Sequence, residues 1–355
     1  MIRRLRWATC ALLLAVGVAA TACPICFRGI TLTTLQQLSA SQRAVLAQPS
    51  PDGKQLRIVA VIKGDAAVGE LLVGESYRVG ATTLDASRPL LMLHSDLSPA
   101  WLSAGSIGIE HADWLRRIAR STPATNASER EWREHVVLLF PDLFSPEPLV
   151  SDIAYTELSR APYAALRALK PRLDAAQLAR LLDHPARAPL FTLLFGIVGG
   201  PEDATVVEQR LVAAWAFNDA SNLAALLAAD LELRGPARLQ WLEKMYFSDR
   251  NRTLPEIEAA LLALSVQGTA NGAVPRERVI QAYRFFMRER KPMAGFVVQD
   301  LAAWNYWDAG PEYLMLLRTN AIQDPASRYA IVSYLMRSPR ADTKAAIKAF
   351  ADSNP

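Results

Sequence analysis

The chain has 355 residues, of which 51% are hydrophobic, 21% are charged and only 8% are aromatic. This composition excludes a disordered tail, a collagen-like fibre and a small disulfide-stapled scaffold. The chain is too long for one ordinary hydrophobic core, so we expect two domains or a repeat array. Beyond the N-terminal segment, no apolar run approaches the roughly 20 residues of a membrane-spanning helix, so we expect no membrane span after signal removal.

Residues 1–22 have the pattern of a secretory signal peptide. Arg3, Arg4 and Arg6 precede an apolar segment of small residues, and Ala20-Thr21-Ala22 fits the rule for a cleavage site. We therefore expect cleavage between Ala22 and Cys23 and a periplasmic or secreted mature protein. Loss of the three arginines lowers the formal net charge from +4 to +1. A nearly neutral protein has no electrostatic footprint for nucleic acid.

Two alternatives stay open for this leader. It could remain uncleaved as an anchor, although its apolar stretch is short. Ala20-Thr21-Ala22-Cys23 could also be a degenerate lipobox, in which Cys23 is acylated and tethers the protein to a membrane. Simple export is the interpretation that we favour.

The segment 23–121 is expected to form a small β-domain that begins with a CxxC segment. Four short runs predict strands, at 43–47, 55–62, 75–79 and 89–94. In the second run, Leu56, Ile58, Ala60 and Ile62 share one face, which is the period of a half-buried strand. Several short strands in so few residues favour a small antiparallel barrel or sandwich.

After this segment the sequence becomes helical. We expect 122–147 to be a linker with one short helix near Trp132–Phe140, and 148–355 to be a helical repeat domain. Predicted first helices of successive pairs begin near Pro148, Ala188, Ala220, Leu254, Pro292 and Pro325. Predicted second helices begin near Pro162, Asp203, Pro236, Pro275, Pro311 and Arg340.

The helix pairs recur at a period of roughly 32–40 residues, which lies in the range of HEAT-like α-solenoids. Gly200-Pro201, Gly235-Pro236 and Gly310-Pro311 each place a glycine that ends one helix before a proline that begins the next. The predicted fold is therefore α+β and multidomain, with a small β-barrel or sandwich followed by an α-solenoid of helical hairpins. An irregular α-bundle is the alternative.

Two cysteines follow the expected cleavage site, because Cys10 lies inside the leader. In an oxidising compartment Cys23 and Cys26 are expected to pair with each other, which would stiffen the N-terminus. The alternative is that the same two thiols act in redox chemistry or bind a soft metal ion such as copper. Phe27 stands where haem attachment would require a histidine.

Other chemistry-bearing residues have ordinary interpretations. Glu131 and His135 are four apart on a predicted helix, and Glu110-His111-Ala112-Asp113 ends the β-region. Neither has the spacing of a zinc protease, so we interpret both as a surface histidine beside a carboxylate. The cluster of Trp304, Tyr306 and Trp307, with Tyr313 nearby, is interpreted as packing between helix pairs. We predict no catalytic, cofactor-binding or metal-binding residue.

The sequence CPICFRG after the cleavage site, the strand ending VIKG and the helical tail resemble an uncharacterised family of secreted bacterial proteins. That resemblance implies export and a small β-domain followed by helical repeats. The N-terminal part also resembles the NTR or TIMP-like OB barrel, through an early cysteine motif and a strand that ends at Lys63-Gly64. TIMP-like chains begin C-x-C, whereas Cys23 and Cys26 have two residues between them.

These observations predict an exported, non-enzymatic binding or scaffold protein. The helical-repeat surface is expected to bind a protein or a component of the cell envelope, with no nucleic acid as partner and no cofactor. The alternative is an extracytoplasmic thiol-redox or metal-binding protein that acts through Cys23 and Cys26.

Overall fold

The computed structural model describes residues 25–26, 32–51, 55–73, 77–78, 87–96, 100–121, 127–270 and 272–352. The fold is α+β, with a small and mainly antiparallel sheet and many helices. The chain divides into two compact units. The first contains the described residues from Leu32 to Ala161. The second contains those from Pro162 onward together with Ile25 and Cys26, which the sequence assigned to the β-domain. The helix Pro148–Arg160 thus belongs to the first unit, whereas the sequence assigned it to the repeat domain.

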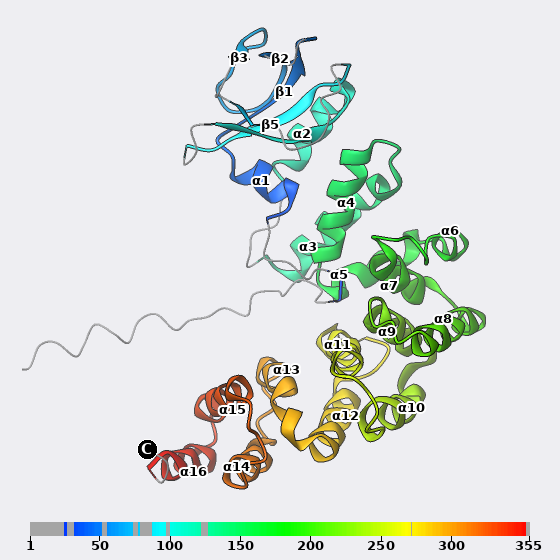
Figure 1. Cartoon of the computed structure of the whole chain (residues 1–355), viewed down its shortest axis with the longest axis vertical. Coiled ribbons are helices and arrows are strands. Elements are labelled where there is room, and N and C mark those ends of the chain that lie inside the picture. Colours follow the sequence, from blue (N-terminus) through cyan, green and yellow to red (C-terminus); the bar gives the residue numbers. More distant parts are fainter. Residues whose placement is uncertain are drawn as a thin grey trace, which may run out of the picture. The chain divides into compact units, whose positions relative to one another are not determined.

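The first unit contains the sheet. Its strands are β1 (Arg43–Pro49), β2 (Gln55–Lys63), β3 (Leu71–Val73), β4 (Tyr77–Arg78), β5 (Leu90–His94) and β6 (Trp101–Ser106). The described strands join one sheet in the order β3-β2-β1-β5-β6-β4, in which only the β4–β6 pair is parallel. The described strands thus form a single sheet, whereas the expected sandwich would require two sheets packed face to face. The sheet is strongly curved (Figure 1), and register shifts along β1 and β5 favour such bending.

Strand β2 follows its predicted pattern, since Leu56, Ile58, Ala60 and Ile62 are all buried. Leu56 and Ile58 join a core cluster that also contains side chains from β1, β3, β5 and β6. Every residue of β5 is buried, as expected for a strand that lies between neighbours and is covered on both faces. The apolar core of the first unit therefore centres on β1, β2 and β5.

Four helices accompany the sheet, namely α1 (Thr34–Ala40), α2 (Ala112–Ile118), α3 (Glu129–Leu139) and α4 (Pro148–Arg160). Capping boxes begin two of them, because the hydroxyls of Thr33 and Ser128 accept from backbone N–H groups at the starts of α1 and α3. Helix α3 is the short helix expected in the 122–147 segment. It belongs to the first compact unit, where Trp132, His135, Val136 and Leu139 are buried.

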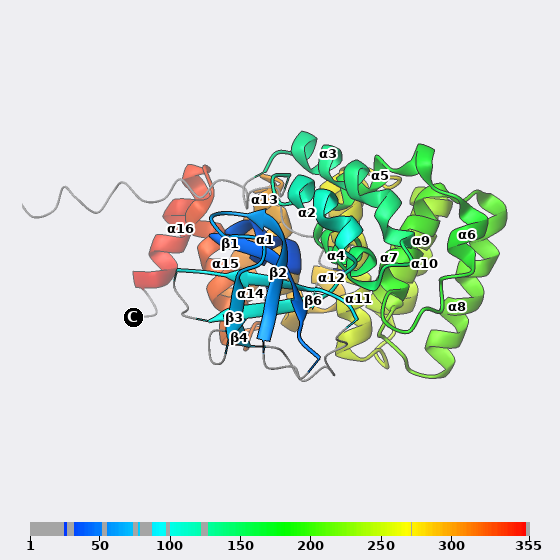
Figure 2. The ribbon, with the colours of Figure 1, turned by 90° about the horizontal axis from the view of Figure 1, so that it is seen from above.

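From Pro162 onward, the regular elements of the described residues are all helices. The helices of the second unit are α5 (Tyr163–Arg167), α6 (Ala175–Ala179), α7 (Ala188–Val198), α8 (Ala204–Ala216), α9 (Leu223–Arg234), α10 (Leu239–Leu242), α11 (Leu254–Ala270), α12 (Arg276–Glu289), α13 (Val298–Ala303), α14 (Gly310–Arg318), α15 (Pro325–Arg337) and α16 (Ala341–Asp352). Figure 1 shows them following one another from green to red, and Figure 2 places α8 and α16 at opposite ends of this unit.

The starts of these helices lie close to the predicted positions. Helices α7, α11 and α15 begin at Ala188, Leu254 and Pro325, as expected. Pro162 and Pro275 are the N-cap residues of α5 and α12. A backbone N–H at this position has no acceptor within the helix, so proline costs no hydrogen bond there.

In the part of the chain that the structure describes, no helix combines the length and the apolar character needed to cross a bilayer.

Candidate functional site

The predicted cysteine pair lies mostly outside the described residues. Ala22 and Cys23, and with them the expected cleavage site, belong to the part that is not described. Cys26 is partly buried and lies in a turn. The disulfide and the redox role of these two residues therefore stay predictions.

The most developed side-chain arrangement of the second unit lies where α9 ends. Arg234 is the last residue of α9, and the 3-10 helix η6 (Gly235–Arg238) follows directly. Gly235 has φ 63° and ψ −156°, a conformation that is essentially restricted to glycine. Arg234 precedes this turn and Arg238 follows it. Both guanidinium groups can therefore reach the carboxylates of Asp230 and Glu208.

Asp230 and Glu208 bind the two arginines. Asp230 lies one turn before Arg234 on α9, is almost fully buried, and accepts from Arg234 at 2.9 Å and from Arg238 at 2.5 Å. Glu208 of α8 accepts from the same arginines at 2.7 Å and 3.4 Å. Burial raises the pKa of Asp230 above its ordinary value, although the two guanidinium groups favour its ionised form. The four side chains together connect α8, α9 and η6.

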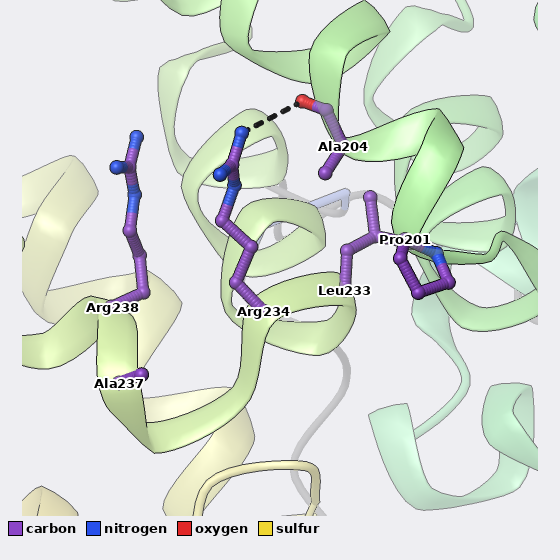
Figure 3. A pocket seen from close by; sticks show the side chains of 6 residues that line it. All are labelled: Pro201, Ala204, Leu233, Arg234, Ala237 and Arg238. Carbon is purple, nitrogen blue, oxygen red and sulfur yellow. Dashed lines mark hydrogen bonds between the residues drawn. The ribbon is translucent and has the colours of Figure 1, made fainter.

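A pocket of about 420 Å³ lies beside this network (Figure 3). Its lining residues are Pro201, Ala204, Leu233, Arg234, Ala237 and Arg238. The guanidinium group of Arg234 also donates to the backbone carbonyl of Ala204 at 3.4 Å, the bond drawn in Figure 3. The lining offers apolar surface and guanidinium donors, a combination that suits binding of a partner's side chain or of a small ligand.

Large apolar side chains are exposed at the other end of α8. Val212 and Trp215 lie three residues apart on one helical face, and they are 58% and 53% exposed. Phe217 follows the helix as its C-cap and is 81% exposed. The guanidinium carbon of Arg252 lies 4.7 Å from the centre of the Trp215 ring, which holds one face of that ring. We call Val212, Trp215 and Phe217 the α8 patch.

The predicted histidine sites have different outcomes. Glu110 and His111 lie in the 3-10 helix η2 (Ile109–His111), and Nε2 of His111 is 3.7 Å from Oε1 of Glu110. A third residue joins them, because Oε2 of Glu147 lies 3.9 Å from the same nitrogen. Sequence reasoning missed Glu147, which is 36 residues from His111 and carries no local signal.

The interpretation of His135 as a surface residue paired with Glu131 is wrong. Glu131 is the N3 residue of a capping box and accepts from the backbone N–H of Ser128 at 2.7 Å. His135 is 3% exposed and its Nε2 lies 3.0 Å from Oε2 of Glu157 on α4. The i,i+4 spacing is real, but each side chain has a nearer partner elsewhere.

The aromatic cluster packs within the helical unit, as interpreted from the sequence. Trp304 stacks on Tyr283 of α12, with ring centres 5.6 Å apart and planes at 10°. Trp307 and Tyr313 both contact Tyr334 of α15, at 5.0 Å and 5.3 Å between ring centres. These rings join successive helices of the unit.

Comparisons with family models, with curated proteins and with solved structures find no match.

Proposed function

We propose that this chain is an exported, non-enzymatic binding protein. In this proposal its helical unit is a HEAT-like α-solenoid of hairpins, and the α8 patch is part of the surface that binds another protein. The site of action is extracytoplasmic, either in the periplasm or outside the cell.

The packing of consecutive helices supports the solenoid interpretation. Helix α9 contacts α7 on one side and α11 on the other, and these three are the first helices of successive predicted pairs. Nine consecutive residues of α9, Leu223–Leu231, are buried, as expected when neighbouring pairs cover each other's apolar faces. Helix α8 contacts α9 but buries only Ala204, Val207 and Leu211, so it lies at the outside of this row.

The observation that carries the binding function is the exposure of Trp215 and Phe217 on this outer helix. These two aromatic side chains, two positions apart in the sequence, leave apolar area in water. Aromatic residues are enriched in protein interfaces and often supply most of the binding energy. Arg252 fixes one face of Trp215, which lowers the entropy lost when a partner covers the ring.

Affinity capture from an envelope fraction of the source organism tests this function. The full chain, the double variant Trp215→Ala/Phe217→Ala and the control Tyr329→Ala serve as baits. Tyr329 is 78% exposed on α15 and so matches Phe217 in exposure on a different helix. We expect the wild type and the control to retain the same protein and the double variant to lose it. A wild type that retains nothing, or a double variant that captures equally well, would contradict the proposal.

Export is tested separately by the intact mass of the mature protein. We expect a chain that begins at Cys23, and a mass two hydrogens lower if Cys23 and Cys26 are joined. A mass increase from acyl chains would show a lipoprotein instead. A mass that retains residues 1–22 would contradict cleavage.

A further inference from the structure

Three side chains of the first unit bring metal-ligand atoms together where the sheet ends. Strand β6 leads through Gly108 into η2, which carries Glu110 and His111, while Glu147 is the N-cap residue of α4. One ligand atom from each of Glu110, His111 and Glu147 lies within 4.8 Å of the other two. The side chains of Glu110 and His111 are 70% and 29% exposed, whereas that of Glu147 is 8% exposed.

Glu147 supplies an independent indication that a ligand is missing from this cluster. Its Oε2 accepts from Arg88 and from the backbone N–H of Gly108. Its Oε1 is fully buried and has no hydrogen-bond partner among the described residues. A buried carboxylate oxygen without a hydrogen-bond partner is costly, and a cation that contacts both oxygens of Glu147 would remove that cost.

The chemistry and the spacing of the three side chains fit a transition-metal ion. A tetrahedral zinc ion with bonds of about 2.1 Å holds its ligand atoms about 3.4 Å apart. The separations from His111 to the two carboxylates are 3.7 Å and 3.9 Å, and the two carboxylates lie within 4.8 Å of each other, so binding would draw the exposed side chain of Glu110 inward. One imidazole and two carboxylates form a donor set that Zn²⁺ accepts. Arg88 offsets one of the two carboxylate charges, which leaves a net attraction for a divalent ion.

We propose that Glu110, His111 and Glu147 form a Zn²⁺-binding site in the first unit. The site borders a pocket of about 460 Å³ whose lining includes Arg88, Gly108, Glu110 and Glu147. Three protein ligands leave the fourth position of a tetrahedral ion for water or for a small anion that enters this pocket. The site is separate from the α8 patch and does not depend on its function.

Gly108 gives this proposal a sharp test. A Cβ at this position would lie 2.1 Å from Oε1 of Glu110, so Gly108→Ala must push that carboxylate away. The backbone itself tolerates alanine, because Gly108 has φ −62° and ψ 143°. This variant therefore removes a ligand from its position without removing the ligand itself.

The experiment measures Zn²⁺ binding by titration calorimetry and Co²⁺ binding by absorption spectroscopy. All proteins carry Cys23→Ser and Cys26→Ser, so that no thiolate competes for the ion. The tested variants are Glu110→Gln, His111→Ala and Gly108→Ala, and the control is His184→Ala.

We expect the parent, which carries only the two cysteine substitutions, to bind one ion per chain. The control His184→Ala should bind with the same affinity. Each of the three tested variants should bind with an affinity lower by about tenfold or more. Bound Co²⁺ is expected to show ligand-field bands without a thiolate charge-transfer band. Zn²⁺ should also raise the Tm of the parent but not that of His111→Ala. If Glu147 serves only to anchor Arg88 and Gly108, the parent will show no saturable binding, or the three variants will bind as well as the control. Either result would overturn the proposal.

Discussion

Nε2 of His135 lies 3.0 Å from Oε2 of Glu157, and both side chains are almost completely shielded from water. Glu157 also accepts from the hydroxyl of Thr33 at 2.6 Å and from Arg160 at 2.7 Å. Arg160 in turn lies over the ring of Trp132. The carboxylate of Glu157 thus connects the segment before α1 to helices α3 and α4 within the first unit.

Replacement of this carboxylate should destabilise the first unit. Glu157→Gln leaves Arg160 buried without a charged partner, which typically costs about 3–5 kcal/mol. Urea denaturation followed by circular dichroism measures the change. Glu134→Gln on α3 removes a carboxylate from an exposed pair with Arg130, and we expect it to cost less than about 1 kcal/mol. Equal effects of the two substitutions would show that the buried network has no special role.

Acid should weaken the same network. Burial alone would raise the pKa of Glu157, but its bonds with His135 and Thr33 and the charge of Arg160 outweigh burial and lower that pKa below 4.5. A lowered folded-state pKa means that the stabilisation is complete above about pH 4.5 and is lost as the pH falls through the folded-state value. We therefore expect the free energy of unfolding to decrease on acidification below this pH. In Glu157→Gln the decrease should be smaller, which denaturation curves at several pH values will show.

Two of the Gly-Pro turns, at Gly235 and Gly200, should respond differently to alanine. Gly235 has a positive φ with ψ −156°, whereas Gly200 has φ −104°. A Cβ on Gly235 would find open space, with Ala273 O at 4.0 Å as its nearest atom, so the expected cost of Gly235→Ala is conformational, about 1–3 kcal/mol. Gly200→Ala serves as the control, because only the flexible end of Glu202 must move. Thermal denaturation of both variants measures the effect as a decrease in Tm. A smaller decrease for Gly235→Ala than for Gly200→Ala would contradict this prediction.

Helices α7 and α9 approach each other at Gly196. A Cβ there would lie 2.6 Å from both Cα and Cβ of Ala229, so one of the helices would have to shift. Helix propensity alone predicts that Gly196→Ala stabilises the protein by about 1 kcal/mol. We expect instead a loss of about 1–3 kcal/mol from overpacking. The sign of the change in the free energy of unfolding therefore tests the contact directly.

Local signals were sufficient for much of the fold. The alternation in β2 predicts its buried face because one side of the strand meets the core. Pro162, Pro275 and Pro325 predict helix starts because proline is compatible with a first turn and with few other helical positions. These features depend on a few neighbouring residues, so a single sequence contains them.

Strand β6, in contrast, was not predicted. Its sequence WLSAGS is mostly small and polar and has no strand pattern of its own. Its conformation comes from pairing with β5 and β4, and Leu149 packs against it, with Cδ1 3.3 Å from the position of a Cβ on Gly105. Leu149 is distant in the sequence, and β5, although it precedes β6 closely in the chain, leaves no strand pattern within residues 101–106.

The candidate metal site was not predicted, because one of its three residues is distant in the sequence. Glu110 and His111 are adjacent and therefore visible as a pair, and they were interpreted as surface residues. Glu147 becomes their neighbour only when α4 packs in the first unit. His135 illustrates the opposite error, since helical spacing suggested Glu131 as its partner although Glu157, on another helix, binds it.

The complete burial of β5 has a consequence for how the sheet assembles. A strand with water on one face cannot slide by one residue without exposing its apolar side chains, but β5 has apolar neighbours on both sides and lacks this safeguard. Its alignment must instead come from the backbone ladders with β1, from Arg43 opposite His94 to Ala47 opposite Leu90, and with β6. Strands β1 and β2 are adjacent in the chain and close a short loop, so their hairpin is the natural template. If β5 paired with this template in a register shifted by one residue, burial of its apolar side chains would still stabilise the misaligned state. Correction of the register would then require the strand to dissociate from the sheet.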